Sequence, residues 1–295
     1  MRRFLGAAAL SVALSAGALS PLGARGLVSA AALGGLRFWD AFHLALEPQW
    51  ELSRAPVRRD ERPLARQAAE MERDLDAVFT TGGGRLYLMD TAPSQVGDVC
   101  LWQGVFAAEA ALRAALDGTA ASRARTAAAL EGLAALTSRG HPLARAFYPA
   151  DLPIEPPGRW YGRDASYQWK EDASVDSLAG WVFGLATVGE LSPELRPRVD
   201  RLAVGFASAL RGGGYILRNS DGTPTRFGKV GGALLNSPTG VLSTMTVLRM
   251  AARAEPSGPW AAEHARFVAQ GQDRWGAYGS GPALWRNTST NHNIA

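Results

Sequence analysis

Two aspartates four positions apart are the first candidates for chemistry in this sequence. Asp172 and Asp176 lie in the segment E-D-A-S-V-D-S, where a strongly apolar stretch begins. If a helix starts here, residues four apart share a face, and two close carboxylates perturb each other's pKa so that one can act as an acid. The D-x-S-x-D spacing also invites a calcium-loop interpretation. The glycine at its sixth position and the glutamate at its twelfth are missing, which excludes an EF-hand.

Similar polar groups stand where other apolar stretches begin. Asp98 precedes one stretch, Asn236 precedes another, and N-H-N at 291–293 lies near the end of the sequence. Asp, Ser and Asn are the preferred helix N-cap residues, and we assign Ser174 and Ser237 to capping alone. A functional role for the others depends on their convergence in one place. We expect one cavity to receive the side chains of Asp98, Asp172, Asp176, Asn236, Asn291 and His292.

Aromatic and basic side chains accompany the carboxylates in a long proline-rich segment, 140–174, which we expect to be a loop. Loops of this length in a compact domain are usually functional. Tyr167 and Trp169 provide aromatic faces that suit a polar ring-shaped ligand, above all a sugar. Arg145 and Lys170 add positive charge, which suits a uronic acid or another anionic group.

Other catalytic signatures are missing from the sequence. Cys100 is the only cysteine, so neither an intrachain disulfide nor a cysteine-based zinc site can form, and we interpret it as a small buried side chain. No two histidines have metal-ligand spacing, and there is no nucleophile elbow, P-loop or dinucleotide-binding motif. We therefore expect neither a metal nor a cofactor.

The elements that must position these side chains alternate in character. Stretches that are apolar nearly all round are typical of buried helices, and those in between carry charge on one face only. The apolar stretches are Val99–Leu116, Val175–Leu191 and Thr239–Met250. The amphipathic stretches are Leu64–Val78, Ala121–Leu136, Pro193–Leu210 and Trp260–Gln270.

This alternation predicts an all-α fold, an α/α toroid in which outer and inner helices are visited in turn. Inner helices of a ring run parallel, so their first turns share one mouth. Three complete outer–inner pairs are fewer than a closed ring needs, and residues 287–295 are typical of the start of another inner helix. We therefore expect an incomplete toroid, a fragment, with a small β-hairpin around Asp221-Gly222.

The N-terminus has the features of an export signal. Arg2 and Arg3 precede the apolar run Phe4–Leu19, and small residues follow at candidate cleavage sites. An uncleaved membrane anchor is the alternative, because no charge interrupts 4–24. Glycine, serine and proline within the stretch 4–24 favour the signal. We predict a signal peptide at 1–30, a linker at 31–60 and the toroid domain at 61–295, in an exported protein of the periplasm, cell surface or extracellular space.

Composition narrows the class of partner. The 295 residues are 47% hydrophobic and 20% charged, which is a globular composition. The net charge of +4 comes from scattered arginines, and no basic run is interleaved with aromatics, so we expect no nucleic acid partner. Membrane contact is expected only through the N-terminal signal or anchor. The sequence leaves the oligomeric state open.

Two ordered motifs resemble a known family. The segment Y-Q-W-K-E-D-A-S-V-D-S from Tyr167 resembles Y-x-W-K-G-D-T-S-S-D-E, and G-Y-I-L from Gly214 with D-G-T-P-T-R-F-G resembles G-Y-x-L with D-G-x-P-T-x-W-G. Asn291-His292 is similar to a later N-N-H. The resemblance covers residues 95–295 and implies an exported bacterial protein of the six-hairpin glycosidase-like superfamily, whose members mostly lack an assigned activity. The chain departs from the pattern at Glu171, Ser177 and Phe227, which replace Gly, Glu and Trp.

These observations predict an exported carbohydrate-active protein that acts on a polysaccharide or oligosaccharide. A glycoside hydrolase would use Asp172 or Asp176 as acid, with Asp98 or the other aspartate as base. A polysaccharide lyase would use His292 or Tyr167 to abstract a proton, with Arg145 or Asn291 on the uronate carboxylate. The alternative is a non-catalytic envelope protein that binds glycan or a protein partner with the same mouth. The residues expected to contact substrate are Arg145, Tyr167, Trp169, Lys170, Asn236 and Asn291.

Overall fold

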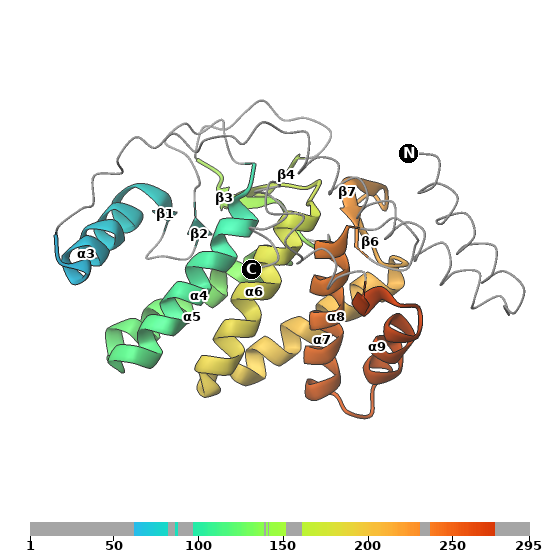
Figure 1. Ribbon diagram of the computed structural model, residues 1–295. Helices are drawn as coiled ribbons and strands as arrows, with labels where there is room; N and C mark the ends of the chain where they lie inside the picture. Colours follow the sequence, from blue (N-terminus) through green and yellow to red (C-terminus); the bar gives the residue numbers. More distant parts are fainter. Residues whose placement is uncertain are drawn as a thin grey trace, which may run out of the picture.

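The computed structural model describes residues 62–81, 86–87, 97–138, 140, 142–151, 161–230 and 237–274. These residues are mostly helical, as expected, with three small antiparallel sheets where one hairpin was predicted (Figure 1). The helices are α3 (Leu64–Asp74) with the π-helical turn η1 (Leu75–Phe79), α4 (Val99–Asp117), α5 (Ala120–Ala135), α6 (Val175–Leu191), the short 3-10 helix η2 (Pro193–Leu195), α7 (Arg196–Gly212), α8 (Pro238–Ala254) and α9 (Trp260–Ala269). The strands are β1 (Thr80–Thr81), β2 (Leu86–Tyr87), β3 (Ala146–Pro149), β4 (Tyr161–Arg163), β5 (Tyr167–Lys170), β6 (Ile216–Arg218) and β7 (Pro224–Lys229).

The ends of the helices follow from local chemistry. Gly118 ends α4 in the left-handed conformation (φ 63°), which glycine adopts without steric cost. Ser174 and Ser177 form a capping box at the start of α6. Ser237 caps α8, accepting a hydrogen bond from the Gly240 N–H at 3.5 Å. Both serines assigned to capping from the sequence therefore have that role.

The three apolar helices pack side by side, with their first turns at the same end. A Cβ atom on Gly180 would overlap the backbone at Leu101, and one on Gly184 would overlap the backbone of Gly104. Because residue numbers rise together along both helices, α4 and α6 run parallel in close backbone contact. A Cβ on Gly240, in the first turn of α8, would lie 3.1 Å from the side chain of Val175, so α8 begins beside the start of α6.

The amphipathic helices α5, α7 and α9 each pack against one or more of these apolar helices. Helix α5 packs on α4, where the Thr126 hydroxyl donates to the Ala110 carbonyl at 3.0 Å and the Gln103 amide donates to the Ala129 carbonyl at 3.0 Å. Helix α7 packs against α6 and α8, and α9 packs against α8 (Figure 1). From α4 to α9, apolar and amphipathic helices therefore alternate along the chain. The described residues do not close a ring, so the toroid stays a prediction.

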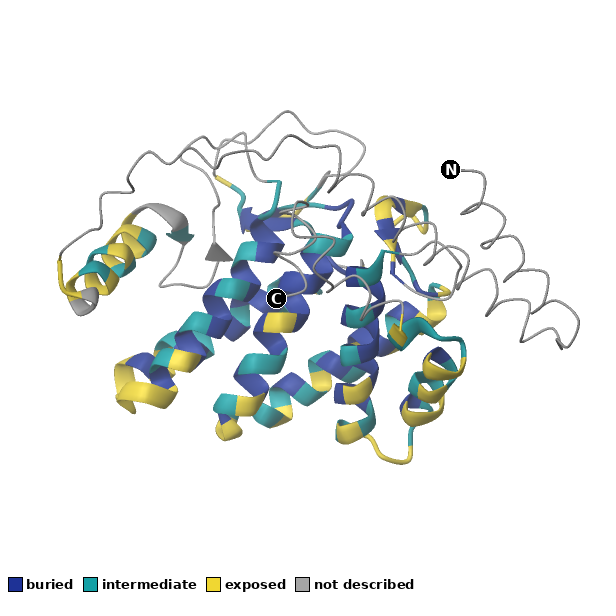
Figure 2. Cartoon of the chain, in the orientation of Figure 1, coloured by how far each residue is buried: buried dark blue, intermediate teal, exposed yellow. Residues whose placement is uncertain are grey.

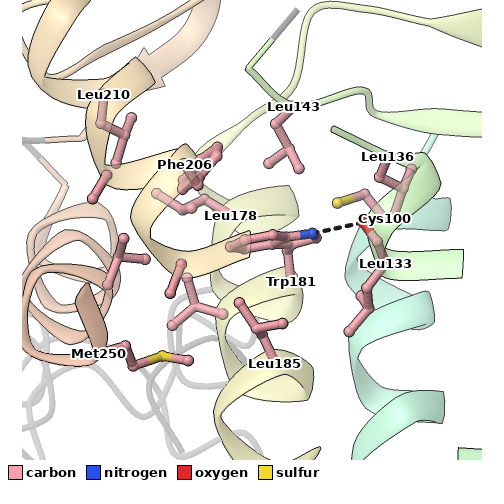
Figure 3. Close-up of a cluster of buried hydrophobic side chains, with 14 of the residues drawn as sticks. Cys100, Leu133, Leu136, Leu143, Leu178, Trp181, Leu185, Phe206, Leu210 and Met250 are labelled. Carbon is pink, nitrogen blue, oxygen red and sulfur yellow. Dashed lines mark hydrogen bonds between the residues drawn. The ribbon is translucent and has the colours of Figure 1, made fainter. Parts of the chain in front are cut away.

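Trp181 lies at the centre of the hydrophobic core between the layers (Figure 3). Its indole N–H donates to the Leu133 carbonyl at 3.0 Å, and its ring meets Phe206 with centroids 4.7 Å apart. Cys100 is also buried here, as expected, and burial raises the pKa of its thiol. Buried residues are concentrated on α4, α6 and α8, whereas α3 and α9 are largely exposed or half-buried (Figure 2).

The proline-rich segment expected to be a loop is partly a sheet. Strands β3, β5 and β4 form one antiparallel sheet in that order, with Phe147 opposite Trp169 and Gly162 also opposite Trp169. The β6–β7 hairpin forms around Asp221-Gly222, as predicted. The strands of both sheets lie toward the end of the molecule where α4, α6 and α8 begin (Figure 1).

Helix α4 is long and apolar enough to cross a membrane by length and composition, among the residues that the structure describes. However, 56% of its apolar window is buried inside the protein, against α5 and α6. We interpret it as a core helix. The predicted signal and linker, residues 1–60, lie outside the described residues.

Candidate functional site

Arg145 connects two of the predicted site residues, Asp98 and Asp172, although they are far apart in sequence. Its Nη2 donates to the Asp98 carboxylate at 3.2 Å, and its Nη1 donates to the Asp172 main-chain carbonyl at 3.4 Å. Its Nε donates to the Gly97 carbonyl. The structure therefore brings Asp98 and Asp172 to one end of the helix layer. All three nitrogen atoms of the Arg145 guanidinium donate hydrogen bonds to other residues of the protein.

Asp172 is buried, and both of its carboxylate oxygens accept hydrogen bonds from Arg226 on β7. Oδ1 accepts from the Arg226 backbone N–H at 2.8 Å, and Oδ2 accepts from its Nε at 2.6 Å. The Asp172 N–H donates to the Asn219 side-chain oxygen at 2.9 Å. The backbone of Asp172 is left-handed (φ 61°), a conformation that Asp adopts more readily than most residues. Both oxygens of this carboxylate are engaged, and they hold the hairpin in place.

Asp176 lies in the first turn of α6 and is half-buried. Asp172 and Asp176 were predicted to share a face as residues four apart on one helix. Asp172 precedes the N-cap Ser174 and has a positive φ, so it lies outside the helix and helical spacing does not apply to the pair. Of the two, Asp176 is the carboxylate placed on the helix itself.

A second buried carboxylate, Glu171, also ties the hairpin to this end of the molecule. It accepts hydrogen bonds from the Ser220 N–H at 2.8 Å and the Ser220 hydroxyl at 2.7 Å. The Trp169 indole N–H donates to the same carboxylate at 3.4 Å. Sequence reasoning missed these roles for Glu171, Asn219, Ser220 and Arg226. The one available signal was that Glu171 replaces a glycine of the resembling motif.

The two aromatic side chains expected to contact substrate, Tyr167 and Trp169, are partly buried. Phe147 meets Tyr167 at a centroid distance of 4.9 Å and stacks with Trp169 at 6.3 Å. The Trp169 ring also lies over Gly162, where a Cβ atom would overlap it. Both rings pack against the hydrophobic core, and half-buried Lys170 follows on the same strand. Asn236, Asn291 and His292 lie outside the described residues, as does the predicted further helix at 287–295.

Two exposed side chains follow each other on β7. The Arg226 side chain is 60% exposed although its partner carboxylate is fully buried, and Phe227 is also 60% exposed. The Arg226 guanidinium carbon lies 5.7 Å from the centre of the Phe227 ring. Within the described part of the chain, the Arg226 Nη groups have no hydrogen-bond partner. Neither residue was predicted to be part of the site.

A groove of about 560 Å³ lies elsewhere, along α3 and α4. It runs from the second turn of α4 toward its C-terminal end, and Phe183 of α6 completes it. Its charged members include Glu109, whose pKa is raised by burial. This mostly apolar groove does not suit a sugar. It is lined by Ala68, Ala69, Glu72, Val105, Ala108, Glu109, Leu112, Arg113, Leu116 and Phe183.

We found no significant match to the chain among protein-family models, curated protein sequences or solved structures. The resemblance to the six-hairpin superfamily therefore stays a prediction. Among the described residues, no three His, Cys, Asp or Glu side chains are grouped closely enough to hold a metal ion.

Proposed function

We propose that the protein is exported and carbohydrate-active, and that it takes up a polysaccharide or oligosaccharide at the end where α4, α6 and α8 begin. One observation carries the proposal. The Arg145 side chain contacts both Asp98 and Asp172, and Asp172 in turn holds Arg226, so alternating charges extend across this end. The positive dipole ends of these helices also favour anionic or hydroxyl-rich ligands at the same end. We further propose that the two alternating layers are part of an α/α toroid.

Among the predicted acids, the hydrogen bonds change which residues suit catalysis. Glycoside hydrolysis needs one carboxyl group on each side of the scissile bond. Asp172 has both oxygens engaged by Arg226, so we test Asp98 together with the half-buried Asp176 in the first turn of α6. Asp98 forms an ion pair with Arg145 and is 38% exposed, so it suits positioning a water molecule better than donating a proton. Asp176 is then the proposed acid.

Binding without catalysis is the second candidate. The hydrogen bonds of Asp172 favour this candidate. Asp172 was one of the two leading acid candidates in the sequence, and its carboxylate cannot reach a ligand while Arg226 bonds both of its oxygens. In this case, Asp98 and Asp176 only contact sugar hydroxyls.

Turnover and binding of a polysaccharide panel by wild type, Asp98→Asn and Asp176→Asn separate the two candidates. Asp74→Asn, an exposed aspartate on α3, is the matched control. In an enzyme, either site variant loses about 100-fold or more in turnover while the control does not. A binding protein shows no turnover, and each amide variant keeps most of its affinity. If the wild type neither turns over nor binds any glycan of the panel, this result contradicts the proposal.

Export is tested separately by N-terminal sequencing of material from a bacterial culture. We expect a mature chain that starts near residue 31 in the periplasm or medium. A chain that begins at Met1 and stays in the cytoplasm contradicts this part of the proposal.

A further inference from the structure

Arg226 is held in one position by a partner that ligand cannot reach. Its Nε and its backbone N–H both donate to the carboxylate of Asp172, which is fully buried. The backbone bond fixes the strand and the Nε bond fixes the side chain. An arginine usually loses rotamer freedom when it binds a ligand, and here much of that freedom is already lost in the folded protein.

The remaining edge of this guanidinium faces outward. The bond through Nε leaves Nη1 and Nη2 without a partner among the described residues, and the side chain is 60% exposed. Two parallel N–H groups on one edge of a guanidinium match the two oxygens of a carboxylate. Asp172 lowers the net charge here, so the recognition depends on the fixed geometry more than on attraction at long range.

Phe227 adds an apolar surface beside that edge. Its ring is 60% exposed and 5.7 Å from the Arg226 guanidinium carbon. A sugar ring has an apolar face that packs on an aromatic ring, and removing both from water is favourable. A ring that carries a carboxylate can use both neighbours together.

We propose that Arg226 and Phe227 form a subsite for a uronate, a sugar ring with a carboxylate. This proposal rests on the proposed function, and it adds that the bound sugar is negatively charged. It also moves the anion-binding role away from Arg145, the residue expected to have it. Arg145 is only 19% exposed, and its nitrogen atoms donate to Gly97, Asp98 and Asp172.

The test compares binding of polygalacturonate with binding of its methyl ester, which has the same backbone without the charge. The proteins are wild type, Arg226→Lys and Phe227→Ala. Lysine keeps a cation for Asp172 but offers no planar pair of N–H groups. Controls are Arg201→Lys, on the exposed side of α7, and Leu116→Ala, whose side chain is 88% exposed at the far end of α4. Thermal unfolding of each variant establishes that it is folded.

We expect the wild type to bind polygalacturonate at least about tenfold more tightly than the ester. Arg226→Lys and Phe227→Ala should each weaken the binding of polygalacturonate about tenfold, which corresponds to about 1.4 kcal/mol, and the controls should not. Because Phe227 is exposed and does not contact Asp172 through a hydrogen bond, its variant tests the subsite even if Arg226→Lys fails to fold.

Equal binding of the acid and the ester, or full affinity in Phe227→Ala, overturns the uronate subsite. Tighter binding of dextran sulfate than of polygalacturonate also overturns it, because the site then recognises sulfate. In these cases the wild type still binds a glycan, so the proposed function stands. If the wild type binds none of these polymers or the neutral glycans of the panel, the proposed function fails as well.

Discussion

Two regions of the molecule use the same chemistry to hold the β6–β7 hairpin, and they leave different groups exposed. At one, Asp172 holds Arg226. At the other, the Tyr215 hydroxyl donates to Glu263 on α9 at 2.5 Å, and Arg266 donates to the same carboxylate through Nε at 3.1 Å and Nη2 at 2.7 Å. Asp172 and Tyr215 both have a left-handed backbone, each with φ 61°.

The two regions differ in which groups of the arginine side chain are already engaged with the protein. Arg266 uses its Nε–Nη2 edge on Glu263 and lies over the rings of Tyr215 (5.3 Å) and Phe267 (5.0 Å), so its edge and its planar surface are engaged. Arg226 keeps its outer edge. In the Tyr215 region, two nitrogen atoms of the arginine bond one carboxylate, and this contact joins the hairpin to α9. The Asp172 region is an anchor with unused hydrogen-bonding capacity, and that makes it the candidate for binding.

Removing the arginine should have the largest effect at the Asp172 region. Arg226→Ala leaves a buried carboxylate without its cation, and we expect the free energy of unfolding to fall by about 3 kcal/mol. Arg266→Ala should cost about 1 kcal/mol, because Glu263 keeps the Tyr215 hydroxyl and lies near Arg211. Urea denaturation of both variants measures the difference.

Arg201→Ala, an exposed arginine on α7, is the control and should change stability by less than about 0.5 kcal/mol. Equal losses in Arg226→Ala and Arg266→Ala would show that the two regions are equivalent and would remove the comparison.

A smaller effect distinguishes the Tyr215 region at high pH. Burial, together with the hydrogen bond and charge of Glu263, raises the pKa of Tyr215 from 10.0 to about 12. The folded state keeps a proton that the unfolded state loses, so stability should fall as the pH rises from 10 to about 12. With allowance for solvent screening, we expect Tyr215→Phe to remove about 1 kcal/mol of this fall. Identical pH profiles for the wild type and the variant would contradict the assigned hydrogen bond.

How much of the fold and of the candidate site could be predicted depends on how far apart in the sequence the contacting residues lie. The buried helix at 175–191 was predicted to the residue, because its apolar pattern and the Ser174 cap are local signals. The three-stranded sheet was missed because its strands are short and interrupted by prolines. The Asp172–Arg226 and Glu171–Ser220 contacts were missed because each joins residues about 50 positions apart. No local pattern indicates which distant side chain a buried carboxylate will meet.

The smallest effect on stability is expected at Asp98, where the proposed function is most sensitive. Its ion pair with Arg145 is partly exposed, so Asp98→Asn should lower the free energy of unfolding by at most about 1 kcal/mol. Chemical denaturation checks this value beside the turnover assay. A loss as large as that of Arg226→Ala would show that Asp98, like Asp172, mainly holds the fold together.

Hydrogen–deuterium exchange with and without saturating polygalacturonate tests the central claim most directly, because it reports which region the ligand covers. We predict slower exchange at β7, residues 224–229, and at the first turn of α4, with no change in α9. Slower exchange confined to α9 or to the groove between α3 and α4 would contradict the claim that the ligand binds where the inner helices begin.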